Sequence, residues 1–242
     1  MFPGADQLTK GNVSEGVWLL TGPPTSGKTS YVVQFLYEHL QEQKTCLYVI
    51  TDQSPSHHLQ LLSKHSKCNL ESLLRIVDAY SWRLGEKDPA ATWSANGLSL
   101  GEVSIVIDKA RLDMQNYAFA LDSITTLSLE AGPAATYKFL QVLTARLRKD
   151  HVPSILTLEE DVHPPNFVSM LKPLFDGIFE MKSTERNDEV EHQFRIASLN
   201  TEHYTSKWIS AENMCVDNIS RHWSEPQTRQ NMNSTETAVI CR

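Results

Sequence analysis

The sequence predicts an α/β domain with a mostly parallel central sheet, helices on both faces and an antiparallel hairpin at the C-terminal end. Short apolar runs alternate with segments whose apolar residues recur at helical spacing. Two of those runs end at residues suited to ligand binding, Gly22 and Asp122. Residues 191–199 and 204–210 alternate apolar and polar side chains, which is typical of paired antiparallel strands.

The first third of the chain alternates expected strands and helices. Residues 16–21 form an apolar run that fits a buried strand, and residues 28–41 have the apolar spacing of a helix. Residues 45–50 are rich in β-branched and aromatic side chains and predict a second strand. Pro55 suits the start of the next helix, and residues 73–78 predict a third strand.

The middle of the chain begins with an expected loop over residues 79–98, which contain Gly85, Pro89 and the pair Asn96-Gly97. A helix is expected over residues 99–115, where Ser99 and Glu102 have the spacing of a capping box. The further expected elements are a strand over 117–121, a helix over 133–149, a strand over 152–158, a short strand over 175–181, and hairpin strands over 191–199 and 204–210.

Length and composition indicate one large domain. The 242 residues are 40% hydrophobic and 21% charged, as in soluble globular proteins. We expect a single domain over residues 1–217 and a polar, flexible tail over 218–242, with disorder at 231–237. The chain has no apolar run of about 18 residues and no signal-peptide pattern at its start. These features favour a cytoplasmic protein without membrane insertion.

Charge and metal-ligating residues narrow the function classes. The net charge of -7 does not favour nucleic-acid binding, which usually needs a basic surface. The four cysteines show no CxxC spacing, and the adjacent His57 and His58 do not form an HExxH pattern. We therefore expect no metal site made wholly of protein ligands.

Residues 22–29 read GPPTSGKT and match the phosphate-binding pattern GxxxxGK[ST] completely. Glycine permits the backbone angles with which loop N–H groups converge on phosphate oxygens. The following helix adds its positive dipole end, and Lys28 adds a positive charge for the β- and γ-phosphates. The motif lies between an expected strand and an expected helix, which favours ATP binding over a chance match. The expected nucleotide-binding residues are Gly22, Pro23, Pro24, Thr25, Ser26, Gly27, Lys28, Thr29 and Ser30.

Asp122 is the expected partner of Thr29 in holding Mg²⁺. It follows the apolar run Tyr-Ala-Phe-Ala-Leu, as the magnesium-binding aspartate of P-loop proteins does. A plain turn-capping role remains the alternative reading of Asp122. Asp108, which follows Ser-Ile-Val-Ile, is a rival candidate, but its neighbours suit one face of a helix.

Asp52 and Gln53 follow the second expected strand and are the candidate catalytic residues. Asp52 is able to accept a proton from water, whereas Gln53 is able only to orient it. A helix-capping turn before Pro55 is an equally good interpretation. Glu159 and Glu160 end another expected strand, and we interpret them as part of a solvated turn rather than of the site.

The arrangement of these motifs resembles the RecA superfamily and, within it, the KaiC-like ATPases of archaea and bacteria. The segments that carry the resemblance are the 22–29 loop, YVITDQSP (48–55), FALDSITTL (119–127), LQVLTARLRKDHVPSILTLEE (140–160) and LFDGIFEMK (174–182). The resemblance implies a RecA-like fold, ATP and Mg²⁺ as ligands, and a structural turn at Asp176-Gly177. Archaeal proteins of this type include the ATP-binding regulator of the archaellum motor and recombinase paralogues.

The chain departs from the family pattern at two places. KaiC-like proteins usually carry paired glutamates where this chain has Asp52-Gln53, and one of the pair serves as the catalytic base. Their last hairpin often bears Lys-Met-Arg-Gly, which reaches the ATP of a neighbouring subunit, whereas residues 198–201 here are Ser-Leu-Asn-Thr. The resemblance therefore implies ATP or ADP binding but supports neither a hexameric ring nor catalysis across subunits.

Three functional hypotheses follow. The first is a nucleotide-dependent regulator or scaffold with slow or absent hydrolysis, which contacts a protein partner or a second copy of itself. The second is an active magnesium-dependent ATPase with Asp52 as base and Asp122 as metal ligand. The third is a recombinase paralogue that binds DNA, which the acidic composition does not favour because only Arg146, Arg148 and Lys149 form a small basic cluster.

Overall fold

The structure is a computed structural model that describes residues 2–10, 13, 15–63, 70–97, 99–186, 189–200 and 203–212. The tail predicted over residues 218–242, with its disordered stretch at 231–237, lies outside the described residues. No helix in the described ranges is long and apolar enough to cross a membrane.

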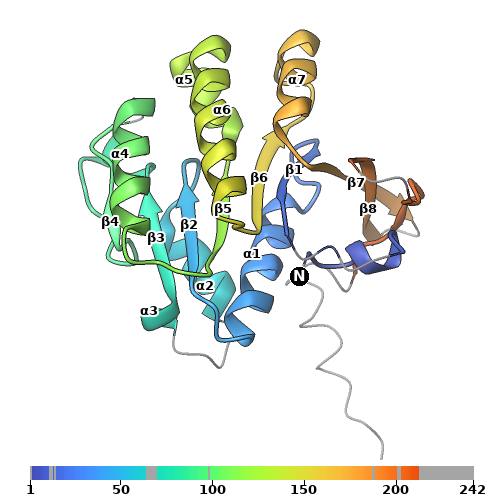
Figure 1. Cartoon of the computed structure of the whole chain (residues 1–242), viewed down its shortest axis with the longest axis horizontal. Helices are drawn as coiled ribbons and strands as arrows, with labels where there is room; N and C mark the ends of the chain where they lie inside the picture. The colour runs from blue at the N-terminus through green and yellow to red at the C-terminus, as the bar shows by residue number, and fades with distance from the viewer. Residues whose placement is uncertain are drawn as a thin grey trace, which may run out of the picture.

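A nine-stranded sheet forms the centre of the described chain, in the order β4-β3-β2-β5-β6-β1-β7-β8-β9 (Figure 1). Neighbouring strands from β4 to β7 are parallel, and β7, β8 and β9 pair antiparallel. The predicted class, a mostly parallel sheet with a C-terminal antiparallel hairpin, is confirmed. The strands are β1 (Val17–Gly22), β2 (Cys46–Ile50), β3 (Leu74–Asp78), β4 (Trp93–Ser94), β5 (Ala118–Asp122), β6 (Ser154–Glu159), β7 (Gly177–Arg186), β8 (Glu189–Leu199) and β9 (Ile209–Ser210).

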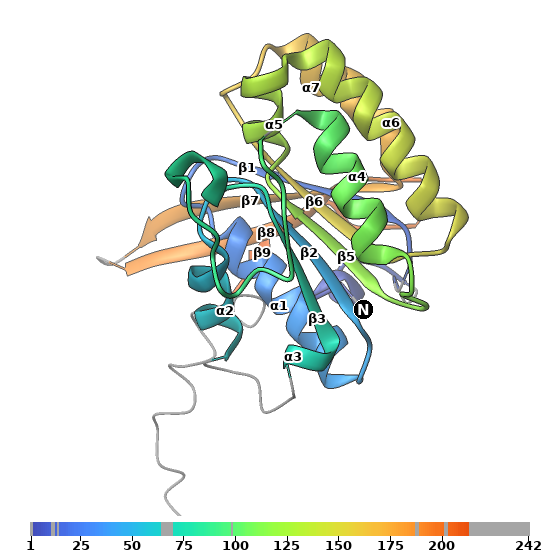
Figure 2. The same cartoon turned by 90° about the vertical axis from the view of Figure 1, so that its left-hand side faces the viewer.

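Helices cover both faces of the sheet. Figure 2 shows α1 and α2 on one face and α4, α5, α6 and α7 on the other. The α-helices are α1 (Lys28–Gln41), α2 (Pro55–Ser63), α3 (Leu70–Leu73), α4 (Leu100–Arg111), α5 (Ile124–Ala131), α6 (Pro133–Lys149) and α7 (Pro165–Leu171), and the 3-10 helices are η1 (Ala5–Gln7), η2 (Ser81–Leu84) and η3 (Lys172–Leu174).

The sheet separates two hydrophobic cores, and the side chains of β1 alternate between them. Trp18 points to the α1 face, where the core is rich in aromatic rings, and its ring stacks on Phe179 with centroids 4.0 Å apart. Val17 and Leu19 point to the opposite face, where the core is mainly aliphatic. Because every residue of β1 is buried, the run reads as continuously apolar, which is typical of a central parallel strand.

The parallel strands bring their carboxyl ends together at one edge of the sheet. In register, Gly22 of β1 lies beside Glu159 of β6, and Ile50 of β2 lies beside Asp122 of β5. Side chains that follow these strands therefore share one edge, where ligands of open α/β sheets bind.

Several element boundaries differ from the sequence-based expectation. The helix expected to reach residue 115 ends at Arg111, and the residues of the expected loop 79–98 include η2 and the short strand β4. Of the strand expected over 204–210, only Ile209–Ser210 pairs with β8. A few backbone hydrogen bonds, such as that from Ala95 N–H to the Asp78 carbonyl, join this loop to the sheet edge, and β4 is correspondingly short. Such contacts leave no periodic signal in the sequence.

Candidate functional site

The loop over residues 22–29 connects β1 to α1 at the carboxyl edge of the sheet. At Gly22 a Cβ atom would lie 2.4 Å from the Met181 carbonyl oxygen and 2.7 Å from Ser26 Oγ, so only glycine fits. Gly27, which precedes α1, has a φ of 91°, in the left-handed region that favours glycine. Both glycines of the motif are therefore required by the backbone of this loop.

Lys28 lies over the loop with its side chain only 5% exposed. Its ammonium donates hydrogen bonds to the carbonyl oxygens of Gly22 at 2.9 Å and Pro23 at 2.7 Å. It also forms an ion pair with Glu159 at 3.0 Å. The positive charge is thus held at the loop by oxygen acceptors from two strand ends.

Asp122 ends β5 as predicted and is buried at the same edge. Its Oδ2 accepts hydrogen bonds from the hydroxyls of Thr29 at 2.8 Å and Tyr48 at 3.5 Å. Its Oδ1 accepts a hydrogen bond from Thr157 of β6. The two residues predicted to bind Mg²⁺, Thr29 and Asp122, are therefore in direct contact.

Asp52 and Gln53 lie just after β2 and are exposed to solvent. Partial removal from water and repulsion by the Asp122 carboxylate raise the pKa of Asp52 to about 7. Lys28 opposes this shift, and because the side chain stays exposed, solvent screens part of it. The structure therefore brings Asp52 into electrostatic contact with Asp122 and Lys28.

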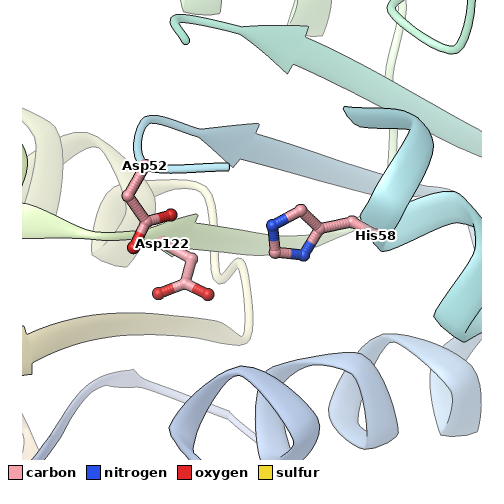
Figure 3. A group of neighbouring side chains, drawn as sticks. All are labelled: Asp52, His58 and Asp122. Atoms are coloured by element: carbon pink, nitrogen blue, oxygen red, sulfur yellow. The ribbon is translucent and has the colours of Figure 1, made fainter. Parts of the chain in front are cut away.

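His58 of α2 joins this group, a placement that sequence reasoning missed. One ligand atom each from Asp52, His58 and Asp122 lie within 4.8 Å of one another, and Figure 3 shows the imidazole ring turned toward the two aspartates. Burial lowers the pKa of His58 to about 4, so the ring is neutral at pH 7. The available sequence signal was a histidine six positions after Asp52.

Glu159 corrects the sequence-based expectation of a solvated turn. It is the last residue of β6, and its carboxylate pairs with Lys28 inside the candidate site. Its backbone N–H is held by the hydroxyl of Thr125 at 2.9 Å. The parallel pairing of β1 with β6 places Glu159 opposite Gly22, which local sequence patterns do not reveal.

Asp108, the rival of Asp122, lies on α4 and away from the loop, as its helical neighbours indicated. It forms ion pairs with Arg111 at 2.9 Å and Arg146 at 2.8 Å. Asp176, in the turn expected at Asp176-Gly177, makes contacts that hold neighbouring elements together. Asp176 accepts a hydrogen bond from the Val17 N–H at 2.7 Å and pairs with Arg148.

The donor set at the sheet edge fits a magnesium-bound nucleotide. A glycine-bounded loop lies at the N-terminal end of the 14-residue helix α1, an arrangement that favours phosphate. The ammonium of Lys28 lies over the loop, and the Thr29 hydroxyl and Asp122 carboxylate supply the hard oxygen ligands that Mg²⁺ prefers. This edge therefore has the features of the α/β P-loop ATPases.

Comparison with known proteins identifies the family. Residues 1–212 match the family model described as "ATPase: KaiC", so the chain belongs to the KaiC family of ATPases. This result confirms the resemblance to KaiC-like members of the RecA superfamily.

Curated relatives with similar sequences are UPF0273 proteins. One from Pyrococcus furiosus is 28% identical over 147 residues, which are 58% of this chain and 60% of that protein. One from Methanopyrus kandleri is 26% identical over 197 residues, which are 78% of this chain and 76% of its own length. One from Thermotoga maritima is 26% identical over 132 residues, or 52% of this chain and 54% of that protein. Archaeal relatives were expected from the resemblance and are found.

Proposed function

We propose that this KaiC-family protein binds ATP with Mg²⁺ at the 22–29 loop and acts as a nucleotide-dependent regulator or scaffold with slow or absent hydrolysis. The observation that carries the proposal is the contact between Thr29 and Asp122 at 2.8 Å beside the buried ammonium of Lys28. These groups supply a metal-binding pair and a phosphate-binding cation within one loop and one strand end.

Each group of the loop has a role in this proposal. The backbone N–H groups of the loop residues other than Pro23 and Pro24 bind phosphate oxygens, and Lys28 neutralises the β- and γ-phosphates. Thr29 and Asp122 hold Mg²⁺, which when bound offsets charge on the phosphates. Asp122 is oriented for this role by the hydroxyls of Tyr48 and Thr157, which fix its two oxygens.

Slow hydrolysis is proposed because the pair after β2 is Asp52-Gln53 instead of two glutamates. Glutamine is not a base, and the raised pKa of the Asp52 carboxyl makes it a weaker acid than an ordinary aspartate, which favours its protonated form near neutral pH. Because ATP would be converted to ADP slowly, contacts with a protein partner or a second copy would also change more slowly than in a fast motor.

An active ATPase is the second candidate, and one observation favours it. A general base works best when its pKa is close to the operating pH, and the pKa of Asp52 is raised to about 7 beside Asp122. In this reading Asp52 takes a proton from the attacking water and Gln53 orients that water.

A DNA-binding recombinase role has less support. Two residues of the small basic cluster are engaged in ion pairs, Arg146 with Asp108 and Arg148 with Asp176. A mobility-shift assay at two salt concentrations tests this role, because phosphate contacts weaken steeply as salt rises. A salt-sensitive shift would support DNA binding, whereas no shift at the lower salt would remove it.

The ATP-dependent regulator proposed above would act in the cytoplasm.

Calorimetric titration of the full chain with ATP and Mg²⁺, together with phosphate release from the same sample, tests the proposal. Lys28→Ala should abolish ATP binding, because it removes the charge that lies over the loop. Lys44→Ala is the matched control, since Lys44 pairs with the exposed Glu42 in a surface contact. Normal ATP binding by Lys28→Ala would show that the nucleotide site is elsewhere.

Asp52→Asn separates the regulator from the ATPase. If Asp52 is a base, the variant binds ATP as the wild type does but loses phosphate release. If wild-type turnover is slow or absent while ATP binds tightly, the regulator role stands and the variant changes little. Fast wild-type turnover that Asp52→Asn abolishes would replace the regulator proposal by the ATPase.

A further inference from the structure

The proposed nucleotide site does not use the imidazole of His58, which lies beside Asp52 and Asp122. Their ligand atoms lie within 4.8 Å of one another, and the three residues come from the end of β2, from α2 and from the end of β5 (Figure 3). His58 and Asp122 are buried, whereas Asp52 lies at the solvent side. The group therefore has an interior end and an open end.

One arrangement of the hydrogen bonds around Tyr48 leaves Nε2 of His58 free to bind a metal ion. The hydroxyl of Tyr48 donates its one proton to Asp122 Oδ2 at 3.5 Å. The same hydroxyl oxygen lies 2.9 Å from His58 Nδ1, and the donor in this contact depends on the tautomer of the ring; when the Tyr48 proton is on Asp122, Nδ1–H donates to Tyr48. Nε2 is then an unprotonated lone-pair donor.

Nε2 of His58 is buried without a hydrogen-bond partner among the described residues. A buried polar atom of this kind normally requires a partner, and the ring is 0% exposed, so bulk water does not supply one. Histidine ligands of metal ions characteristically donate their other N–H to an oxygen that fixes the tautomer. The chain from His58 through Tyr48 to Asp122 has this form.

The charges around the group favour a cation. Asp52 interacts with the carboxylates of Asp122 and Glu159 and with the ammonium of Lys28. These three carboxylates lie near the ammonium of Lys28, which is paired with Glu159, and the guanidinium of Arg83 donates to the carbonyl of Thr51, the residue before Asp52, at 3.1 Å. The remaining two carboxylates belong to the group that contains His58.

We propose that Asp52, His58 Nε2 and Asp122 bind a divalent transition-metal ion, of the Mn²⁺, Co²⁺ or Zn²⁺ class, beside the phosphate-binding loop. Ligands around such an ion lie about 2.1 Å from it and so at most about 4.2 Å apart. The three ligand atoms lie within 4.8 Å of one another, and Asp52 is the exposed member of the group. The imidazole selects this class over Mg²⁺, which prefers oxygen ligands.

This site differs from the magnesium position proposed for the nucleotide, although the two share Asp122. It also departs from the sequence-based expectation that protein ligands alone form no metal site, because ligands distant in sequence produce no spacing motif. Three protein ligands leave coordination positions open for water or a phosphate oxygen. Since the site needs no nucleotide, its test is independent of ATP binding.

A Co²⁺ titration of the untagged full chain without nucleotide, followed by visible absorption, tests the proposal. We expect one Co²⁺ per chain in the wild type and at least tenfold weaker binding in His58→Gln and in Asp52→Asn. His57→Gln is the matched control, because His57 is the exposed neighbour of His58 on the same helix. It should bind Co²⁺ like the wild type.

A spectroscopic readout makes the test independent of variant folding. With Mn²⁺ as the probe, electron spin-echo modulation of the wild type should show a directly bound histidine nitrogen, and His57→Gln should retain it. Absence of nitrogen modulation, or equal Co²⁺ affinity in wild type and Asp52→Asn, would overturn the proposal. Lys28→Ala should retain Co²⁺ binding while losing ATP, so failure of one site is distinguishable from failure of the other.

Discussion

Two aspartates that both follow apolar runs occupy contrasting regions of the molecule. Asp122 lies at the carboxyl edge of the sheet, buried, and accepts hydrogen bonds from the neutral hydroxyls of Thr29, Tyr48 and Thr157. Asp108 lies in the layer formed by α4 and α6, 41% exposed, and pairs with two guanidinium groups. The charge of Asp108 is neutralised locally, whereas hydroxyls leave the charge of Asp122 available for a cation.

The polar groups of the two regions differ in the same way. A cavity of about 380 Å³ lies between α4 and α6, and its wall is mainly apolar. Asp108, Arg111 and Arg146 line part of it, but they pair with one another. At the sheet edge, polar groups from the loop, β2, β5 and β6 converge instead. Convergence of polar groups, rather than the volume of a cavity, therefore identifies the chemically competent region.

Truncation of each aspartate should expose this contrast most strongly. Asp122→Ala leaves the donors of Thr29, Tyr48 and Thr157 without their acceptor, which should lower the free energy of unfolding by about 3 kcal/mol. Asp108→Ala breaks half-exposed ion pairs and should lower it by less than about 1 kcal/mol. Urea denaturation of both variants measures the difference. Equal losses would mean that the hydroxyl network of Asp122 contributes no more than a surface ion pair.

Glycines in the two regions provide a second contrast. Gly22→Ala places a Cβ 2.4 Å from the Met181 carbonyl oxygen, so it should destabilise the protein by about 2 kcal/mol and weaken ATP binding. Gly101→Ala, in the first turn of α4, meets no atom within 4 Å and should stabilise by roughly 0.5 kcal/mol. Thermal unfolding and nucleotide titration report both effects. A neutral Gly22→Ala would show that the loop relaxes without loss.

Much of the fold could be predicted from sequence because its signals are local. The runs that became β1, β2 and β5 are continuously apolar, and Ser99 accepts a hydrogen bond from the Glu102 N–H as its capping pattern predicted. The Glu102 carboxylate, however, accepts from the Asn96 N–H. Element ends and such loop contacts depend on tertiary packing and were less accurate.

The candidate site was predictable only where one motif contains its residues. Lys28 and Thr29 stand inside such a motif, and Asp122 was found because it ends an apolar run. Glu159 and His58 were missed, since their places depend on the parallel pairing of β6 with β1 and on the packing of α2. Strand register and helix packing are long-range properties that a single sequence does not display.

Neutralisation of Glu159 should show whether its carboxylate competes with ATP for Lys28. Its carboxylate lies 3.0 Å from the Lys28 ammonium and competes with phosphate for that cation. Glu159→Gln should therefore raise ATP affinity by roughly threefold to tenfold, which corresponds to about 1 kcal/mol. Glu160→Gln, the adjacent control, should leave affinity within about twofold of the wild type, a difference of less than ~0.5 kcal/mol. Reduced affinity in Glu159→Gln would instead mean that Glu159 positions Lys28 for the nucleotide.

The smallest expected effect is a pH dependence of stability at Asp52. Its pKa is raised to about 7 in the folded chain, against about 3.9 for an unfolded aspartate. The folded state therefore binds the proton more tightly, and this stabilisation is fully present below about pH 4 and is lost as pH rises toward 7. Asp52→Asn does not titrate and should gain stability relative to the wild type between pH 5 and pH 8, by less than about 1 kcal/mol because the side chain is exposed.

Urea denaturation at pH 5 and pH 8 without divalent ions measures this difference, with Gln53→Ala as the neighbouring control that does not titrate. We expect the stability of Asp52→Asn relative to the wild type to increase with pH and that of Gln53→Ala to stay constant. A pH-independent difference for Asp52→Asn would mean that solvent screens Asp52 from Asp122. The charge of Asp52 would then be compensated by its surroundings, as that of Asp108 is. The contrast between the two regions would rest on Asp122 alone.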